Sequence, residues 1–139
     1  WYKRRNNFNL RLSMNSEHGE VAIEVANNII IIRASGAFNE YGAKKYTNSI
    51  RDAVANMKGE SFSILINNLE FQGATPEAYH ELESYNVWLN KQKLIAKAMV
   101  ITSLITLDVI DKHSPSRASQ QTRNFDNEEE AMSWIHSLK

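Results

Sequence analysis

Apolar residues in the first part of the chain follow the period of β-strands. Between positions 20 and 25 they recur at every second residue, which is the pattern of a strand with one buried face. Asn27-Asn28 fits a tight hairpin turn, because asparagine tolerates positive φ. Ile29–Ile32 follows, and four consecutive β-branched residues predict a central strand that is covered on both faces. Residues 34–37 are predicted to form a loop.

The pattern then changes to that of a helix. Apolar residues from 43 to 57 recur at intervals of three and four, which predicts a helix from an Asn39 cap to about Lys58 with one apolar face. Gly59 is expected to end this helix in the left-handed conformation. A third strand is predicted from Ser61 to Asn67, because its apolar run stops at two asparagines.

The junction after the third strand is the first place to look for a site. Thr75 is expected as the N-cap of the next helix, with Pro76 and the acidic Glu77 in its first turn. Such a junction joins free backbone amides to the positive end of the helix dipole, as ligand sites of α/β domains do. The helix is predicted to run from Pro76 to about Lys91.

The rest of the chain is predicted to add two strands and two helices. We expect a strand at 94–102, a short helix at 106–112, an edge strand at 122–125 and a terminal helix capped by Asp126 or Asn127. The order β-β-α-β-α-β-α-β-α predicts an α/β fold, with helices on a mixed sheet of about five strands. Residues 20–139 form one domain in this interpretation.

Residues 1–19 look like a basic leader or tail outside the core of that domain. The chain begins with Trp1, and Met14 would serve as the start of the native domain. Two interpretations stay open. The segment is either an extension without structure of its own, or a membrane-associated segment, because 1–5 resembles the aromatic and basic flank of a membrane helix.

Composition excludes several classes of protein. The chain of 139 residues has no cysteine, which excludes disulfide frameworks, thiol catalysis and thiolate metal sites. No apolar run approaches the roughly 20 residues that span a membrane. Four basic residues lie within 1–16, so the remainder carries 12 Lys and Arg against 16 Asp and Glu, which argues against nucleic-acid binding. We therefore expect a soluble, cytoplasmic protein.

Residues with catalytic or metal-binding chemistry form no recognisable constellation. Glu77 and His80 share a helix face at a spacing that di-iron bundles use twice, but here it occurs once. Asp108, Asp111 and His113 lie close in sequence, without a nucleophilic serine on a tight elbow. The five glycines are scattered and form no phosphate-binding loop. We expect no catalysis, no cofactor and no metal.

Aromatic residues point to a different kind of site. Phe38 and Tyr41 are expected in the loop before the first helix, and Phe71 in the loop before the second. In the expected topology these loops meet at one edge of the sheet, where the three rings would line a pocket for an apolar small molecule or lipid. The alternative is that they anchor the loops to an ordinary core.

Three stretches of sequence carry a resemblance to a known family. They are the Ile29–Ile32 strand that leads to Gly36 and a long helix, the segment ILINNLEFQGATPEAY, and the ending RNFDNEEEAMSWIHSL. Together they resemble the STAS domain, the anti-sigma-factor-antagonist fold, in a divergent bacterial branch that also resembles the CRAL-TRIO lipid-transfer domain. The resemblance covers residues 20–139.

This resemblance implies a non-catalytic regulatory or scaffolding module. In regulatory STAS domains a hydroxyl of an Asp-Ser-Ser-Gly turn is phosphorylated at the start of the second helix. Thr75 matches the second serine of that turn, whereas Gly73 and Ala74 stand where the Asp and the first Ser belong. The implied partner is a protein, with a second copy of this chain as one candidate, and the expected surface residues are Thr75, Glu70, Gln72 and Tyr79.

Overall fold

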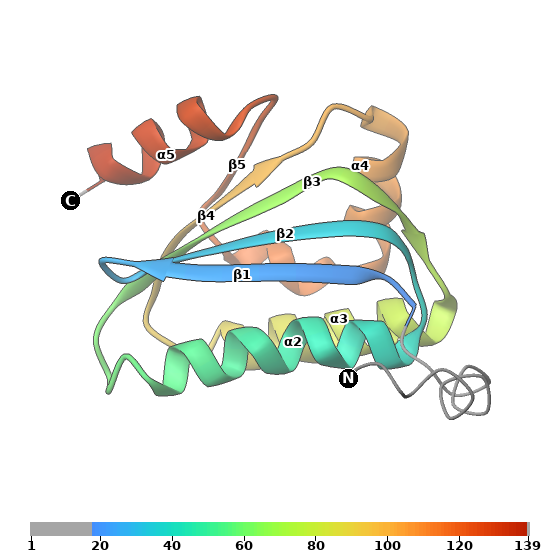
Figure 1. The fold of residues 1–139 in the computed structure, drawn as a ribbon, viewed down its shortest axis with the longest axis horizontal. Coiled ribbons are helices and arrows are strands. Elements are labelled where there is room, and N and C mark those ends of the chain that lie inside the picture. Colours follow the sequence, from blue (N-terminus) through green and yellow to red (C-terminus); the bar gives the residue numbers. More distant parts are fainter. Residues whose placement is uncertain (1–17, 139) are drawn as a thin grey trace, which may run out of the picture.

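The computed structural model describes residues 18–138 (Figure 1). In this range the chain forms five strands, four α-helices and one 3-10 helix, η2. In chain order they are β1 (Glu20–Ala26), β2 (Ile29–Phe38), α2 (Glu40–Ala55), β3 (Phe62–Ala74), α3 (Pro76–Leu89), β4 (Leu94–Val100), α4 (Leu104–His113), η2 (Pro115–Ser119), β5 (Thr122–Phe125) and α5 (Glu128–Ser137). The predicted order of elements is confirmed. The predictions made for residues 1–17, including Met14 and the membrane-associated segment, lie outside the described residues.

The strands form one mixed sheet in the order β1-β2-β3-β4-β5. β1 pairs antiparallel with β2, and every later pair is parallel. Because the sheet grows in one direction and crossovers are right-handed, α2, α3 and α4 are expected on the same face. Figure 1 shows α2 and α3 beneath the sheet, and α5 reaches the opposite face only because it follows the last strand.

The hairpin and the central strand follow the predictions. Asn27 and Asn28 have φ values of 52° and 65°, which a two-residue hairpin turn requires. Ile30 and Ile32 pack into the cluster between the sheet and helices α2 and α3, whereas Ile29 and Ile31 pack against α5. The run of four isoleucines is therefore buried on both faces of the sheet.

Both parallel strands that lead to the predicted site are longer than expected. The predicted loop at 34–37 belongs to β2, and the predicted loop after Asn67 belongs to β3. Pairing of the two strands resumes after a register shift at Ser35 opposite Glu70 and continues across a second shift to Phe38 opposite Ala74. Backbone pairing holds this region extended, although its polar residues and glycines are typical of a loop.

Helix ends differ from the predictions by a few residues. α2 ends at Ala55 with Asn56 as its C-cap, so the prediction that Gly59 caps this helix is wrong. Gly59 instead has a φ of 85° in the turn that leads to β3. The N-caps Asn39, Thr75 and Asn127 are confirmed by hydrogen bonds from side-chain oxygens to backbone amides.

A charged network fastens α5 to the sheet. Arg33 Nε and Nη2 donate to the two carboxylate oxygens of Glu128 at 2.7 and 2.9 Å. Asn67 Nδ2 donates to the same carboxylate at 2.6 Å, and Arg33 Nη1 donates to Glu24 at 2.8 Å. The Arg33 hydrogen bond, with a smaller contribution from Asn67, lowers the pKa of Glu128 against the opposing effect of partial burial.

Candidate functional site

Thr75 lies at a rigid junction between β3 and α3. Its Oγ1 accepts a hydrogen bond from the Ala78 amide at 3.1 Å, and Pro76 occupies the first turn of the helix. The Thr75 amide donates to the Phe38 carbonyl at 2.9 Å, which ties the junction to the end of β2. The side chain is exposed and is already fully used as a cap.

Of the four predicted contact residues, three are exposed and one is buried. Glu70, Gln72 and Thr75 are exposed. Tyr79 is only 6% exposed, so its expected place on the surface is wrong. It packs with Met99, and its ring stacks on His113 with 4.5 Å between centroids. One helical turn after Thr75, α3 already faces the core at Tyr79, and burial raises the pKa of its hydroxyl.

Two of the three predicted pocket aromatics come together. Phe38 is the last residue of β2 and Phe71 lies within β3, rather than in loops, and their ring centroids are 5.8 Å apart. Phe38 also meets Tyr46 edge to face at 6.4 Å. Tyr41 lies in α2 with 42% of its surface exposed and does not line a cavity with the other two.

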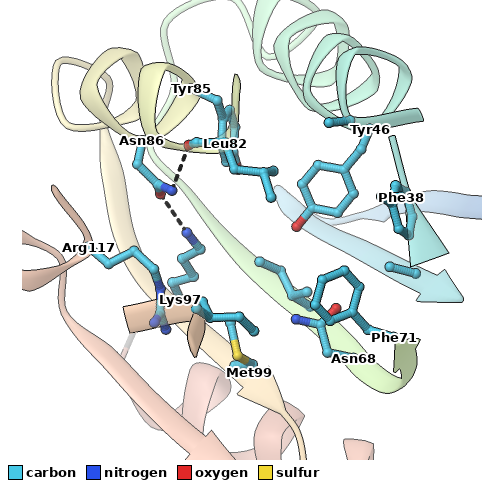
Figure 2. Close-up of a pocket in the computed structure, with 14 residues that line it drawn as sticks. Phe38, Tyr46, Asn68, Phe71, Leu82, Tyr85, Asn86, Lys97, Met99 and Arg117 are labelled. Carbon is cyan, nitrogen blue, oxygen red and sulfur yellow. Dashed lines mark hydrogen bonds between the residues drawn. The ribbon is translucent and has the colours of Figure 1, made fainter. Parts of the chain in front are cut away.

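Phe38 and Phe71 line a small cavity between the sheet and helices α2, α3, α4 and η2 (Figure 2). Its volume is about 50 Å³. Figure 2 shows Phe38, Phe71 and Tyr46 on one side, and Lys97, Asn86 and Arg117 on the other. The cavity therefore has an aromatic end and a polar, cationic end.

Lys97 is the unexpected member of this group. It lies in the middle of β4, only 2% exposed, and its Nζ donates to Asn86 Oδ1 at 2.9 Å and to Gln120 Oε1 at 3.1 Å. Among residues 18–138 no carboxylate forms an ion pair with it. Burial, helped by the nearby Arg117 charge, lowers its pKa from 10.5 to about 7. A large fraction of this amine is therefore neutral at physiological pH.

Two further polar groups of the cavity lining are buried without a partner. Arg117 is 7% exposed, and its Nη1 pairs with Asp111, but its Nε has no hydrogen-bond partner within residues 18–138. The hydroxyl of Tyr85 is likewise unpartnered. Burial raises the pKa of this hydroxyl well above 10. Buried polar atoms without partners are rare, and they mark places where a ligand or water completes the hydrogen bonding.

Neither Lys97 nor Arg117 was predicted from the sequence as a site residue. The signal for Lys97 was present, because a lone lysine interrupts the apolar run LIAKAMVI of a buried strand. Charged residues are almost never fully buried without a reason. Arg117 gave no such signal, since it lies in a polar segment after a proline, and only the packing of η2 against α3 buries it.

An exposed apolar surface lies near the predicted contact residues. Leu104 and Ile105 open α4 and are 80% and 81% exposed, and Leu69 of β3 is also exposed. Leu104 and Ile105 follow the carboxyl end of β4, and Leu69 lies in the part of β3 beyond its pairing with β4, which ends at Asn67 opposite Val100. They therefore lie toward the same end of the sheet as Glu70 and Gln72. We call Leu69, Glu70, Gln72, Thr75, Leu104 and Ile105 the β3–α4 surface.

Residues 18–138 contain neither a metal-binding cluster nor a helix that could span a membrane. No group of three His, Asp or Glu residues in this range is arranged to hold a metal ion. None of the helices described there has the length and apolar character needed to cross a bilayer.

No family model and no curated protein matches the chain. Solved structures match its fold. One is an uncharacterized protein of the DUF3478 family with a SpoIIAA-like fold from Shewanella loihica PV-4, at 16% identity and a TM-score of 0.64 over 87% of this chain and 96% of that one. Another is an anti-sigma factor antagonist from Mycobacterium paratuberculosis, at 13% identity and a TM-score of 0.61 over 85% and 94%.

A third match is the anti-sigma factor antagonist SpoIIAA in its unphosphorylated form, at 14% identity and a TM-score of 0.61 over 85% of this chain and 97% of that one. The chain therefore has the SpoIIAA-like fold of anti-sigma-factor antagonists, as its sequence predicts. At these identities the likeness establishes the fold alone. The CRAL-TRIO resemblance stays a prediction.

Proposed function

We propose that this protein is a non-catalytic regulatory or scaffolding module that binds a protein partner through the β3–α4 surface. The observation that carries the proposal is the exposure of Leu104 and Ile105 at the start of α4, together with the exposure of Glu70, Gln72 and Thr75 at the same end of the sheet. Apolar side chains surrounded by polar ones are typical of the centre and rim of a protein interface. Two of its structural neighbours are described as anti-sigma factor antagonists, which supports a regulatory role.

The test compares a double variant of exposed apolar residues with a single variant that serves as its control. Leu104→Ser with Ile105→Ser removes the apolar part of the β3–α4 surface. Ile95→Ser is the matched control, because Ile95 is also exposed but lies near the start of β4, at the opposite edge of the sheet. We expect the double variant to lose captured partners that the wild-type chain and the control retain in crosslinking and mass spectrometry. Identical capture by all three proteins would refute the proposed surface.

Thr75 is the proposed point of regulation on this surface. A phosphate there would add negative charge at the positive end of the α3 dipole, next to the partner surface. The absence of an acidic residue at Gly73 departs from the STAS motif and weakens this part of the proposal. Thr75→Glu is expected to weaken partner capture, while Thr75→Ser keeps both the cap and the capture. Equal partner capture by the two variants would refute the proposal that Thr75 is a point of regulation.

A second proposed function is the binding of an apolar small molecule in the cavity. The observation that favours it is the pairing of Phe38 and Phe71 at the aromatic end. Ligand pockets typically measure roughly 300–1,000 Å³. The cavity of about 50 Å³ is well below this size, so a lipid would require it to open. Native mass spectrometry of the purified chain tests the idea, and the absence of any adduct would count against it.

The proposal also includes a cytoplasmic location and, as one candidate partner, a second copy of this chain. Sedimentation or light scattering at several concentrations distinguishes the homodimer from a different partner. A strictly monomeric chain would leave a different protein as the partner. If Leu104→Ser with Ile105→Ser converts a dimer to a monomer, the β3–α4 surface is the dimer interface.

A further inference from the structure

The cationic end of the cavity has no structural task that explains all of its groups. Lys97 donates to Asn86 and Gln120 and lies over the Tyr85 ring, 5.6 Å from its centroid, so the third N–H of its ammonium form has no hydrogen-bond acceptor among residues 18–138. The Nε of Arg117 and the hydroxyl of Tyr85 have no partner in the described part of the chain. Lys97 of β4, Arg117 of η2 and Tyr85 of α3 are all among the residues that line the same small cavity.

The surroundings of these donors select the charge of a ligand. Lys97 and Arg117 are both basic and buried, and Asp111, the one carboxylate that pairs with either of them among residues 18–138, binds Arg117 from a position that is largely exposed. An acceptor that carries negative charge would use all three donors and offset the burial of the two cations. A neutral acceptor could use the donors but would not offset the two buried cations, and a cationic ligand would do neither.

The opposite end of the cavity selects the rest of the ligand. Phe38, Phe71 and Tyr46 face the cationic end across the cavity in Figure 2, and Ile66, Leu82 and Met99 lie among the lining residues. A water molecule needs roughly 10–15 Å³ by the measure used for such cavities, so about 50 Å³ has room for only a few non-hydrogen atoms. The ligand must combine a negative group with a very short apolar part.

We propose that this cavity binds a short-chain monocarboxylate, with its carboxylate at Lys97, Arg117 and Tyr85 and its alkyl group toward Phe38 and Phe71. The inference rests on the second proposed function, ligand binding in the cavity, and names the chemistry of that ligand. It is independent of the β3–α4 surface. It makes the chain a sensor or carrier of a small organic acid in addition to a partner-binding module.

Binding should depend on pH through Lys97. Because burial holds its pKa at about 7, the amine loses its charge above neutral pH. The affinity for a carboxylate should then fall by up to about tenfold for each pH unit above 7. The other charged or titratable groups around it, on α2, α3, α4 and η2, are Tyr46, Glu83, Tyr85, Asp111 and Arg117. The two tyrosines have raised pKa values and stay neutral in this range.

The experiment titrates the wild-type chain with propionate and, as an uncharged isostere, with propionamide, while NMR follows the backbone amides. We expect saturable shifts confined to the cavity lining for propionate and at least about tenfold weaker binding of propionamide. Equal binding of the two compounds would overturn carboxylate recognition and leave ligand binding in place. No saturable binding of either compound would overturn both.

Two variants assign the effect to the cavity. Lys97→Met keeps most of the side-chain volume and should weaken propionate binding by at least about tenfold. Lys44→Met is the matched control, because Lys44 is an exposed lysine of α2 in an ion pair with Glu40. Unchanged binding in Lys97→Met would refute the site. If Lys97→Met does not fold, the wild-type comparison of propionate with propionamide still decides the question.

Discussion

Replacing Lys97 with methionine should remove a pH dependence from the folding of this protein. In the folded chain burial lowers the Lys97 pKa to about 7, against 10.5 when unfolded. Between these two values the unfolded chain holds a proton on Lys97 that the folded chain has released. Raising the pH in this window therefore favours the folded state, and the gain is complete only above the unfolded pKa.

The size of the effect follows from the two pKa values. One pKa unit corresponds to about 1.4 kcal/mol, so the whole shift corresponds to about 5 kcal/mol. From about pH 7 to about pH 9 the wild-type chain should gain about 2 kcal/mol of unfolding free energy from Lys97 alone. Staying below the usual tyrosine pKa avoids the opposing titration of Tyr46 and Tyr85, whose pKa values burial raises.

Urea denaturation at several pH values, followed by the fluorescence of Trp88 and Trp134, measures the effect. The difference between wild type and Lys97→Met cancels the contributions of all other titrating groups. In the variant Asn86 Oδ1 keeps its hydrogen bond from Gln120 Nε2 at 3.0 Å, so we expect a folded chain. The unfolding free energy of the wild type should increase relative to that of the variant as the pH rises. Parallel curves would mean that Lys97 stays charged, and the argument from burial would fail.

Three further predictions concern the cap of α3, the Arg33–Glu128 ion pair and the exposed apolar residues of α4. Thr75→Ala should cost about 1 kcal/mol of unfolding free energy through loss of the α3 cap, and Thr75→Ser much less, as chemical denaturation will measure. Glu128→Gln should lower the unfolding free energy by about 0.5–1 kcal/mol at neutral pH, because it removes the ion pair with Arg33. In the wild type this contribution should be lost as the pH falls through the lowered pKa of Glu128. An unchanged urea midpoint of the variant at neutral pH would argue against a stabilising pair. Leu104→Ser with Ile105→Ser should leave the thermal midpoint nearly unchanged, because both side chains are exposed, and a large drop would mean that they pack in the folded chain.

Periodicity predicted the elements well, but the buried face predicted for β1 is wrong at Ile23 and Val25, which are 39% and 51% exposed. Alternation gave β1, the four isoleucines gave a strand covered on both faces, and asparagine and threonine caps gave three helix starts. The extensions of β2 and β3 could not be predicted from side chains. Residues such as Asn68 and Gly73 are typical of loops, and they lie in β3 at the register shifts, because the residues on both sides of them pair with β2.

The candidate site was harder to predict than the fold. Phe38 and Phe71 were expected together on the ground that both precede helices, and they do meet, but as strand residues. Tyr79 was misplaced because the helix turns it inward one turn after Thr75. The cationic end of the cavity depends on how η2 packs against α3 and β4, and contacts between segments so far apart in sequence leave no local pattern.

The double attachment of Thr75 limits how a modification there can act. Its amide is held by the end of β2 and its hydroxyl by the first turn of α3. A phosphate would take over the hydroxyl while the backbone remains paired on both sides. The backbone at Thr75 therefore stays in place when the side chain is modified. A phosphate on Thr75 would act on a partner through its negative charge at a constant position, without folding or unfolding of the surrounding segment.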